Sequence, residues 1–204
     1  DPIETRVAAS PDTVKKMAGL GLTVIVEKGA GHSSRITDDA YAAAGAKIGS
    51  ASDAKSADVV LKVRRPNAAE IKSYKKGAAI IAAMDPYGQN DAVKAMADAG
   101  LSAFAMEFMP RITRAQVMDI LSSQANLAGY QAVIDASAEY DRAMPMMMTA
   151  AGTVAAAKVF VMGAGVAGLQ AIATARRLGA VVTATDVRPA AKEQVASLGA
   201  KFIA

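Results

Sequence analysis

The stretch from Lys158 to Arg188 constrains the fold of this 204-residue chain more than any other. It reads KVFVMGAGVAGLQAIATARRLGAVVTATDVR. The apolar, β-favouring run Lys158–Met162 predicts a strand buried on both faces. Good helix formers follow at Leu169–Leu178, Gly179 closes them as a C′ residue, and Val181–Thr185 predicts a second strand. Strand, helix and strand in this order indicate a βαβ unit.

Three glycines follow the first strand at G-x-G-x-x-G spacing: Gly163, Gly165 and Gly168. In a dinucleotide site the first makes the tight turn, the second lets the backbone approach a pyrophosphate, and the third lets helix pack on strand. The helix N-terminus adds partial positive charge for the phosphates. A glycine turn also arises for steric reasons alone, but here strands and helix stand in register with it. The stretch therefore predicts a dinucleotide-binding unit.

An acidic residue, Asp186, ends the second strand, about 20 residues after the first glycine, where such folds bind the adenosine ribose. Its carboxylate would accept hydrogen bonds from the ribose hydroxyls and repel a 2′-phosphate, which favours NAD(H) over NADP(H). Arg188 follows closely, and an arginine there can serve a 2′-phosphate. With Asp186 present, we interpret Arg188 as a neighbour of the adenosine end, so NAD(H) is favoured and NADP(H) stays open.

Composition narrows the functional classes. Cysteine is absent, which excludes disulfides and thiolate chemistry, and the single histidine, His32, is interpreted as a loop residue; no metal site is predicted. The net charge is +4, but basic residues are scattered and aromatic residues make up only 4%, which argues against nucleic-acid binding. The apolar segment Thr153–Ala175 contains the glycine motif, so we do not interpret it as a membrane span.

The rest of the chain repeats one α/β pattern. A helical segment ends near glycine and an apolar strand follows at Gly19–Glu27, Ala43–Gly49 and Ala97–Glu107. Two more strands are predicted at Asp58–Val63 and Ala78–Met84. The fold class is therefore α/β, with two Rossmann-like parallel-sheet domains.

We predict an N-terminal α/β domain at residues 1–110, a long helix linking the domains at 111–143, and the first half of a Rossmann NAD-binding domain at 144–204. A complete fold of this type has six strands, so the second domain is expected to be only partly present. The strand end Leu61–Pro66 carries basic side chains, for which a ligand role and a solvated loop both stay open.

The segment Pro110–Tyr130 reads PRITRAQVMDILSSQANLAGY. From Thr113 onward, apolar residues recur at four-residue spacing, which predicts a long helix. If the helix is already formed at Gln116, then Gln116, Asp119 and Ser122, at three-residue steps, would lie on one flank of it. Polar side chains near its start could hold a carboxamide and a ribose: Arg111, Arg114, Gln116, Asp119 and Ser122. On spacing alone, a solvated amphipathic helix is the simpler interpretation.

These two stretches, together with RVAASPDTVKKMAGLG and VEKGAGHSSRITDDAYAAAGA, resemble the NAD(H)-binding component, or alpha subunit, of proton-translocating NAD(P) transhydrogenases. The resemblance covers essentially the whole chain. It implies hydride transfer between NADH and NADP⁺, coupled to proton translocation by partner domains. It also implies an NADP(H)-binding component and a membrane proton-channel domain as partners, and a homodimer. The implied location is the cytoplasmic face of the bacterial inner membrane, or the mitochondrial matrix side, with no membrane span in this chain.

The resemblance also implies roles for residues. Arg111, Gln116 and Asp119 match a loop beside the nicotinamide, where the arginine pairs with the aspartate and the glutamine faces the NADP(H)-binding component; these are the catalytic candidates. The cofactor-binding candidates are Arg111, Arg114, Gln116, Asp119, Ser122, Gly163, Gly165, Val166, Gly168, Asp186, Val187 and Arg188.

Alanine dehydrogenase is a close relative of that family and the alternative function. Its pyruvate-binding arginine and lysine have counterparts in Arg6 and Lys62. Its catalytic histidine lies just after the strand that matches Ala78–Met84, where this chain reads MDPYGQN. Oxidation of an amine needs a general acid/base near the substrate carbon, and no histidine stands there to supply one. A non-catalytic NAD-binding module is the other alternative.

Overall fold

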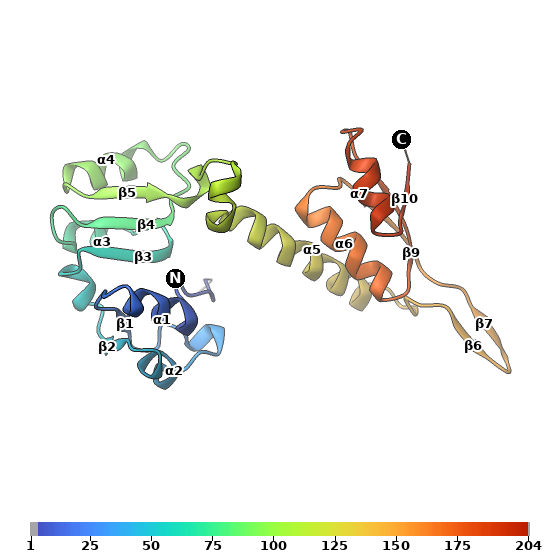
Figure 1. The fold of residues 1–204 in the computed structure, drawn as a ribbon, viewed down its shortest axis with the longest axis horizontal. Helices are drawn as coiled ribbons and strands as arrows, with labels where there is room; N and C mark the ends of the chain where they lie inside the picture. The colour runs from blue at the N-terminus through green and yellow to red at the C-terminus, as the bar shows by residue number, and fades with distance from the viewer. Residues whose placement is uncertain (1–3, 204) are drawn as a thin grey trace. The chain divides into compact units, whose positions relative to one another are not determined.

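The computed structural model describes residues 4–203, except for the side chain of residue 54. These residues form two compact units: an N-terminal unit that ends at Met118 and a C-terminal unit that begins at Asp119. Figure 1 shows them from blue to green and from yellow to red. Helices alternate with parallel strands in both, which confirms the predicted α/β class. The division falls inside the predicted linking segment 111–143.

The N-terminal unit contains two parallel sheets. Its strands are β1 (Ile25–Glu27), β2 (Lys47–Gly49), β3 (Val59–Arg64), β4 (Ala79–Ala83) and β5 (Ser102–Ala105). β1 pairs with β2, and the larger sheet has the order β3-β4-β5. Ile80 in the central strand stands opposite Val60 and Ala103 and is fully buried. The glycine-strand pattern thus predicts the strands of this unit well.

Three of the four α-helices that the structure describes in this unit begin at a capping side chain. The helices are α1 (Pro11–Gly19), α2 (Asp38–Ala43), α3 (Ala68–Ser73) and α4 (Asn90–Asp98), with 3-10 turns η1 (His32–Ser34), η2 (Asp53–Lys55), η3 (Met106–Phe108) and η4 (Thr113–Met118). The Ser10 hydroxyl accepts the amide of Thr13 at 3.3 Å, and Pro11 takes the first helical position of α1. Asn67 caps α3 by accepting two first-turn amides.

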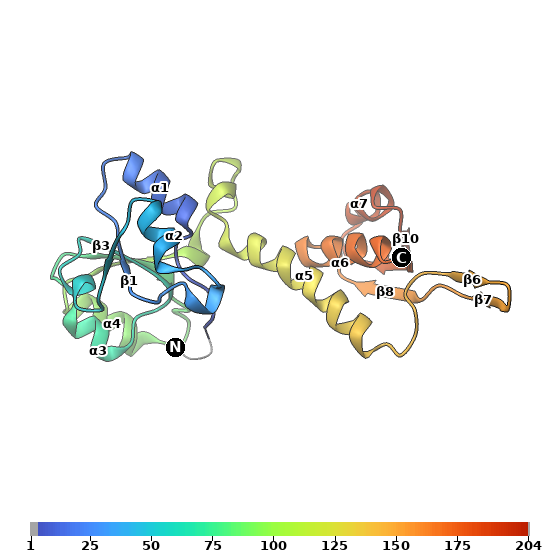
Figure 2. The same ribbon diagram turned by 90° about the horizontal axis from the view of Figure 1, so that it is seen from below.

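The C-terminal unit is organised around the predicted βαβ stretch. Its elements are α5 (Ile120–Glu139), β6 (Met147–Thr149), β7 (Gly152–Val154), β8 (Lys158–Met162), α6 (Val166–Arg177), β9 (Val181–Thr185), α7 (Ala191–Ser197) and β10 (Lys201–Phe202). The parallel sheet has the order β10-β9-β8. α5 lies beside α6 in both views (Figures 1 and 2). Ile172 and Val195 are fully buried in the core between helices and sheet.

The prediction that the first strand of this unit is buried on both faces is wrong. In β8 the side chains of Val159 and Val161 pack on the core, whereas Phe160 and Met162 are exposed. β8 is an edge strand of the described sheet, and α6 packs against it on one face. Its apolar run therefore alternates in burial despite its uniform composition.

The predicted long helix from Thr113 also starts later than expected. Residues Thr113–Met118 form the 3-10 turn η4, and the α-helix begins at Ile120. Asp119 has extended backbone angles and its carboxylate accepts the amide of Ser122, which is the geometry of an N-cap. Capping at Asp119 outweighs the apolar spacing that continues on its N-terminal side.

The hairpin formed by β6 and β7 is not predicted from the sequence. The two strands pair antiparallel, with Met147 opposite Val154. Every residue of both strands is exposed, including Met148. Sequence patterns miss this hairpin because each strand has only three residues and no alternation in polarity. Across residues 4–203, no helix combines the length and the apolar character needed to cross a membrane.

Candidate dinucleotide-binding site

The turn between β8 and α6 has the geometry that a pyrophosphate needs. Gly163 has φ +94°, a conformation that residues with a side chain rarely adopt, and its amide donates to the carbonyl of Thr185 at 2.8 Å. A Cβ on Gly168 would lie 1.7 Å from the carbonyl oxygen of Gly163, so α6 sits directly on the turn. Both predicted roles agree with this geometry.

The start of α6 is open to a ligand. Gly165 is the N-cap residue, and within residues 4–203 no side chain caps this helix. No atom lies within 4 Å of the position that a Cβ on Gly165 would take. The first-turn amides of a helix have no partner within the helix, and they carry partial positive charge. This helix start can therefore accept phosphate oxygens.

Asp186 is bound tightly to the same turn. Its Oδ2 accepts the amide of Ala164 at 2.7 Å, and its Oδ1 accepts the amide of Arg188 at 2.8 Å. The Arg188 guanidinium donates to both carboxylate oxygens at 3.0 Å. The Asp186 side chain is only 6% exposed, against 61% for Arg188. Hydrogen bonds from the Arg188 side chain, and then from the two amides, hold the pKa of Asp186 well below its usual range.

The sequence predicts Asp186 as an acceptor for the ribose and Arg188 as its neighbour, and this arrangement adds detail to both interpretations. The carboxylate is ionised and stands at the end of β9, where a ribose would lie. Arg188 faces Asp186 and also donates to the carbonyl of Ala164 at 3.3 Å. Val166 opens α6 and is half-exposed, and Val187 is 99% exposed. The roles of these four side chains toward a nucleotide stay predictions.

The structure brings together only some of the predicted polar residues around η4. Asp119 accepts both the amide of Ser122, at 2.9 Å, and its hydroxyl, at 2.7 Å. Gln116, Asp119 and Ser122 do not share one helix flank, because the condition for it is not met: Gln116 lies in η4 and α5 starts after Asp119. Arg111, Arg114 and Gln116 are exposed residues of the N-terminal unit. Pairing of Arg111 with Asp119 remains a prediction.

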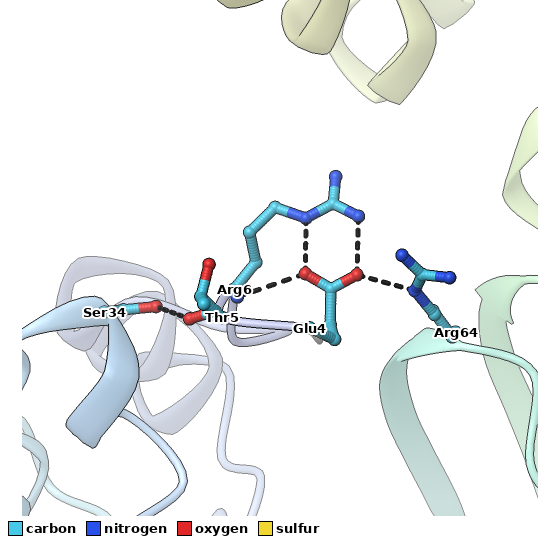
Figure 3. A network of polar contacts seen from close by, with 5 residues as sticks. All are labelled: Glu4, Thr5, Arg6, Ser34 and Arg64. Atoms are coloured by element: carbon cyan, nitrogen blue, oxygen red, sulfur yellow. Dashed lines mark hydrogen bonds and ion pairs between the residues drawn. The ribbon is translucent and has the colours of Figure 1, made fainter. Parts of the chain in front are cut away.

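The two residues that match alanine dehydrogenase substrate ligands already have carboxylate partners. Figure 3 shows Glu4 between two arginines: Arg6 donates through Nε and Nη2 at 2.7 and 2.8 Å, and Arg64 donates through Nε at 2.7 Å. The Lys62 ammonium is paired with Glu70. A neighbouring carboxylate offsets the positive charge that would attract a substrate carboxylate.

Alanine dehydrogenase would carry its catalytic histidine in the loop after β4. In this chain, side chains from other elements bind the backbone of that loop. Asp85 has φ +42°, which is uncommon for a residue with a side chain. The Glu107 carboxylate accepts the amides of Met84 and Asp85, and the Arg65 guanidinium donates to their carbonyls at 2.6 and 2.9 Å. Arg65 therefore holds this loop, a structural role that differs from the solvated loop considered from the sequence.

A cavity of about 360 Å³ adjoins this strand end. Its lining residues are Arg65, Pro66, Asn67, Ala68, Ile71, Gln89, Asp91, Ala92 and Ala95. Asn67 is committed to capping α3, and Arg65 to the carbonyls after β4. Two of the polar groups that line the cavity thus already serve the fold.

Sequence reasoning missed the carboxylates that organise these contacts. Glu70 could have been found, because Asn67 and Glu70 have the N-x-x-E spacing of a capping box, and both of its hydrogen bonds are present. Glu4 and Glu107 carry no local signal. Glu4 meets Arg64 across 60 residues of sequence, and Glu107 meets Met84 across 23.

Comparison with known proteins fits this geometry. The family model for the alanine dehydrogenase/PNT N-terminal domain matches residues 1–128, and the C-terminal domain model matches residues 132–204. The chain belongs to the alanine dehydrogenase/PNT family. Both halves of the chain are therefore accounted for by one family.

The individual relatives include both transhydrogenases and alanine dehydrogenases. The chain is 59% identical to the first of the parts of NAD(P) transhydrogenase subunit alpha in Rhodospirillum rubrum, over 99% of this chain and 54% of that protein. A crystal structure of transhydrogenase from Sinorhizobium meliloti matches with a TM-score of 0.97 and 74% identity, over 100% of this chain and 61% of that chain. Alanine dehydrogenase of Bilophila wadsworthia is 31% identical over 90% of this chain and 49% of that protein. The chain spans about half the length of the curated relatives it matches.

The first prediction concerns Glu4 and pH. The pKa of Glu4 lies well below the ordinary 4.5. Hydrogen bonds from Arg6 lower it most, burial opposes them, and the hydrogen bond from Arg64 lowers it further. The unfolded chain takes up this proton near pH 4.5, whereas the folded chain does so only at much lower pH. Glu4 therefore stabilises the fold fully above about pH 4.5, and this contribution is lost as the pH falls toward the folded-state pKa.

We expect Glu4→Gln to lower the free energy of unfolding at pH 7, and the difference from wild type to shrink steadily below about pH 4.5. Denaturant titrations at several pH values measure this. Asp98→Asn is the control, because it removes an exposed ion pair with Lys94 that should contribute little. A pH-independent difference for Glu4→Gln would contradict the ion-pair explanation.

The second prediction tests whether Asp119 stabilises α5 through its capping hydrogen bond or through its negative charge. Asn is as good an N-cap as Asp, so Asp119→Asn should leave the stability of the C-terminal unit nearly unchanged, whereas Asp119→Ala should cost about 1 kcal/mol. Glu139→Gln, at the exposed far end of α5, is the control. Thermal unfolding of the three variants measures the effect. Equal losses for Asn and Ala would show that capping is not what Asp119 contributes.

Proposed function

We propose that this chain is the NAD(H)-binding component of a proton-translocating NAD(P) transhydrogenase, which passes hydride between NADH held here and NADP⁺ held by a partner. The observation that carries the proposal is the bond between the Asp186 carboxylate and the Ala164 amide, which joins a ribose acceptor to the glycine turn in one site. The similarity to NAD(P) transhydrogenase subunit alpha of Rhodospirillum rubrum over 99% of this chain supports it.

In this proposal, bound NADH supplies the hydride, so the chain itself has to bind and orient rather than to donate or accept protons. The amides at the start of α6 bind the pyrophosphate, with Gly163, Gly165, Val166 and Gly168 shaping the turn. Asp186 accepts the adenosine ribose hydroxyls, and Val187 and Arg188 border them. The value of such residues lies in holding the reacting ring in near-attack geometry.

We assign the nicotinamide end to the polar residues around η4. Arg111 and Arg114 bind and orient the cofactor, and Gln116 faces the NADP(H)-binding component. Asp119 and Ser122 complete the group at the start of α5, where the bond between their side chains already fixes both. The uncharged amide of Gln116 takes no proton, so it acts by position alone.

The partners follow from the same proposal. The NADP(H)-binding component and a membrane proton-channel domain complete the enzyme. The Rhodospirillum rubrum relative is named as one of several parts of subunit alpha, which supports the existence of further components. The chain then lies at the cytoplasmic face of the bacterial inner membrane, or on the mitochondrial matrix side, attached through those partners.

We further propose that the protein is a homodimer. The hairpin of β6 and β7 supports self-association, because Met146, Met148 and Val154 are all more than half exposed. An isolated two-stranded ribbon is marginally stable in water, so burial of its exposed apolar side chains against another chain would stabilise it. Sedimentation of the full-length protein would give the mass directly, and a monomer at all concentrations would exclude this.

Alanine dehydrogenase activity remains the second candidate because of the 31% identical relative. The ion pairs of Arg6 with Glu4 and of Lys62 with Glu70 argue against it, as does the absence of histidine after β4. A non-catalytic NAD-binding module would need the glycine turn but none of Arg111, Gln116 and Asp119.

The third prediction tests the nucleotide. The full-length protein should bind NADH more tightly than NADPH, and Asp186→Ala should weaken NADH binding about tenfold to a hundredfold, the scale of hydrogen bonds to a charged group. Arg188→Ala keeps the carboxylate and should have a smaller effect on NADH. Equilibrium titration of both nucleotides decides, and equal affinities in the wild type would overturn the role of Asp186.

The fourth prediction tests the reaction. With an NADP(H)-binding component, the full-length protein should transfer hydride from NADH to NADP⁺ in a single turnover. Gln116→Asn shortens the side chain by one methylene, and misplacement of about 1 Å can slow transfer about a hundredfold while NADH affinity stays unchanged. Gln194→Asn, at an exposed position on α7, is the control.

A wild-type rate for Gln116→Asn would remove the positioning role. Formation of alanine from pyruvate, ammonia and NADH, at a rate that depends on Arg6 and Lys62, would instead promote the dehydrogenase alternative. Tight NADH binding without either reaction would favour the non-catalytic module.

A further inference from the structure

Gly129 stands in the middle of α5, where glycine is a poor choice for a helix. Glycine in a helix interior costs about 1 kcal/mol relative to alanine. Its neighbour Ala128 is exposed, whereas Gly129 is buried. A buried interior glycine usually has a packing reason, and here the reason can be identified.

The reason is a backbone-to-backbone approach between α5 and α6. A Cβ on residue 129 would lie 2.0 Å from the carbonyl oxygen of Ala167, 2.8 Å from its carbonyl carbon and 3.0 Å from its Cα. These are main-chain atoms of a helix and cannot rotate away as a side chain could. Only glycine at position 129 permits this separation of the two helices, which lie side by side in Figures 1 and 2.

Contacts on both sides hold the helices at this separation. The Asn126 side-chain amide donates to Gln170 of α6 at 3.1 Å. Val133, one turn beyond Gly129, is buried in the core that includes Ile172 of α6. The approach at Gly129 is therefore one section of a continuous interface within the C-terminal unit.

The contacted residue lies in the section of α6 that would meet phosphate. Ala167 is the second residue of α6, and the next residue, Gly168, packs on the carbonyl of Gly163 in the glycine turn. The first turn of α6 is thus in close backbone contact with both Gly163 and Gly129. A displacement of α6 away from α5 would move its first-turn amides.

We propose that Gly129 is a positioning residue for the nucleotide phosphates: it lets α5 fix the first turn of α6, and so the amides that bind the pyrophosphate. The proposal rests on the proposed function, and it adds a residue outside the glycine motif. Gly129 touches no ligand. It acts on the pyrophosphate, but not on the adenosine, which is held at the end of β9.

The test compares ligands with and without the pyrophosphate. In the full-length protein, Gly129→Ala should weaken NADH and ADP-ribose about tenfold or more, because the helices must separate by about 1 Å and ligand contacts are sensitive on that scale. Binding of adenosine, which lacks phosphate, should not change. Isothermal titration for NADH and ADP-ribose and NMR titration for adenosine provide the affinities.

Two controls accompany this variant. Val195→Ala, in the buried core at α7, should lower thermal stability by removing buried methyl groups, while leaving the ratio of NADH to adenosine affinity unchanged. Ala128→Gly reports the effect of helix propensity at an exposed position. If Gly129→Ala does not fold, Asn126→Ala loosens the same interface without a clash and should lower the same ratio, by a smaller factor.

The outcomes are distinct. A lowered NADH to adenosine ratio in Gly129→Ala, or in Asn126→Ala, supports the proposal. An unchanged ratio in a folded variant overturns it, as does equal weakening of both ligands. If the wild type binds no NADH, the proposed function fails together with this inference; if it binds NADH but transfers no hydride, only the transhydrogenase assignment fails.

Discussion

The bond from the Ala164 amide to the Asp186 carboxylate ties the C-terminal unit together at its candidate site. The preceding amide, that of Gly163, is bound to the carbonyl of Thr185. Two successive amides of the glycine turn are therefore fixed to the end of β9. Because the turn and the acid come from adjacent parallel strands, one piece of sheet holds both the glycine turn and Asp186. Such preorganisation reduces the cost of ordering groups on binding.

The N-terminal unit uses its charges differently. Around β3, cations meet carboxylates of the same unit: Arg6 and Arg64 meet Glu4, and Lys62 meets Glu70. The contact with Arg64 anchors the segment around Glu4 to β3. The contact with Lys62 anchors the capping-box residue Glu70 to the same strand. An arginine already in a bidentate bond has less to offer a substrate carboxylate. The two units thus share a fold class but use their carboxylates differently: around β3 they pair with cations, whereas Asp186 also binds the amides of the glycine turn.

Local patterns predicted most of the fold, because β8, α6 and β9 each follow from contiguous periodicity and glycine placement. Three features escaped for identifiable reasons. The start of α5 is decided by capping at Asp119, which competes with an apolar spacing that runs past it. The β6–β7 hairpin has strands too short to show a period. The pairing of Glu4 with Arg64 spans 60 residues and leaves no local mark. In the candidate site, the glycine turn and Asp186 were predictable, whereas the commitment of both Asp186 oxygens to protein donors was not.

Helix α5 connects the two ends of the candidate site within the C-terminal unit. Its N-cap Asp119 is bonded to Ser122, which keeps the first turn from fraying. Gly129 lies about 15 Å further along, at a rise of about 1.5 Å per residue, and presses on Ala167. A helix is stiff over this length, so Asp119 and Ser122 are held at a fixed distance from the first turn of α6 within the C-terminal unit. In the proposed hydride transfer, in which the chain orients the nucleotide rather than exchanging protons, that distance would help to set the geometry of the bound nucleotide.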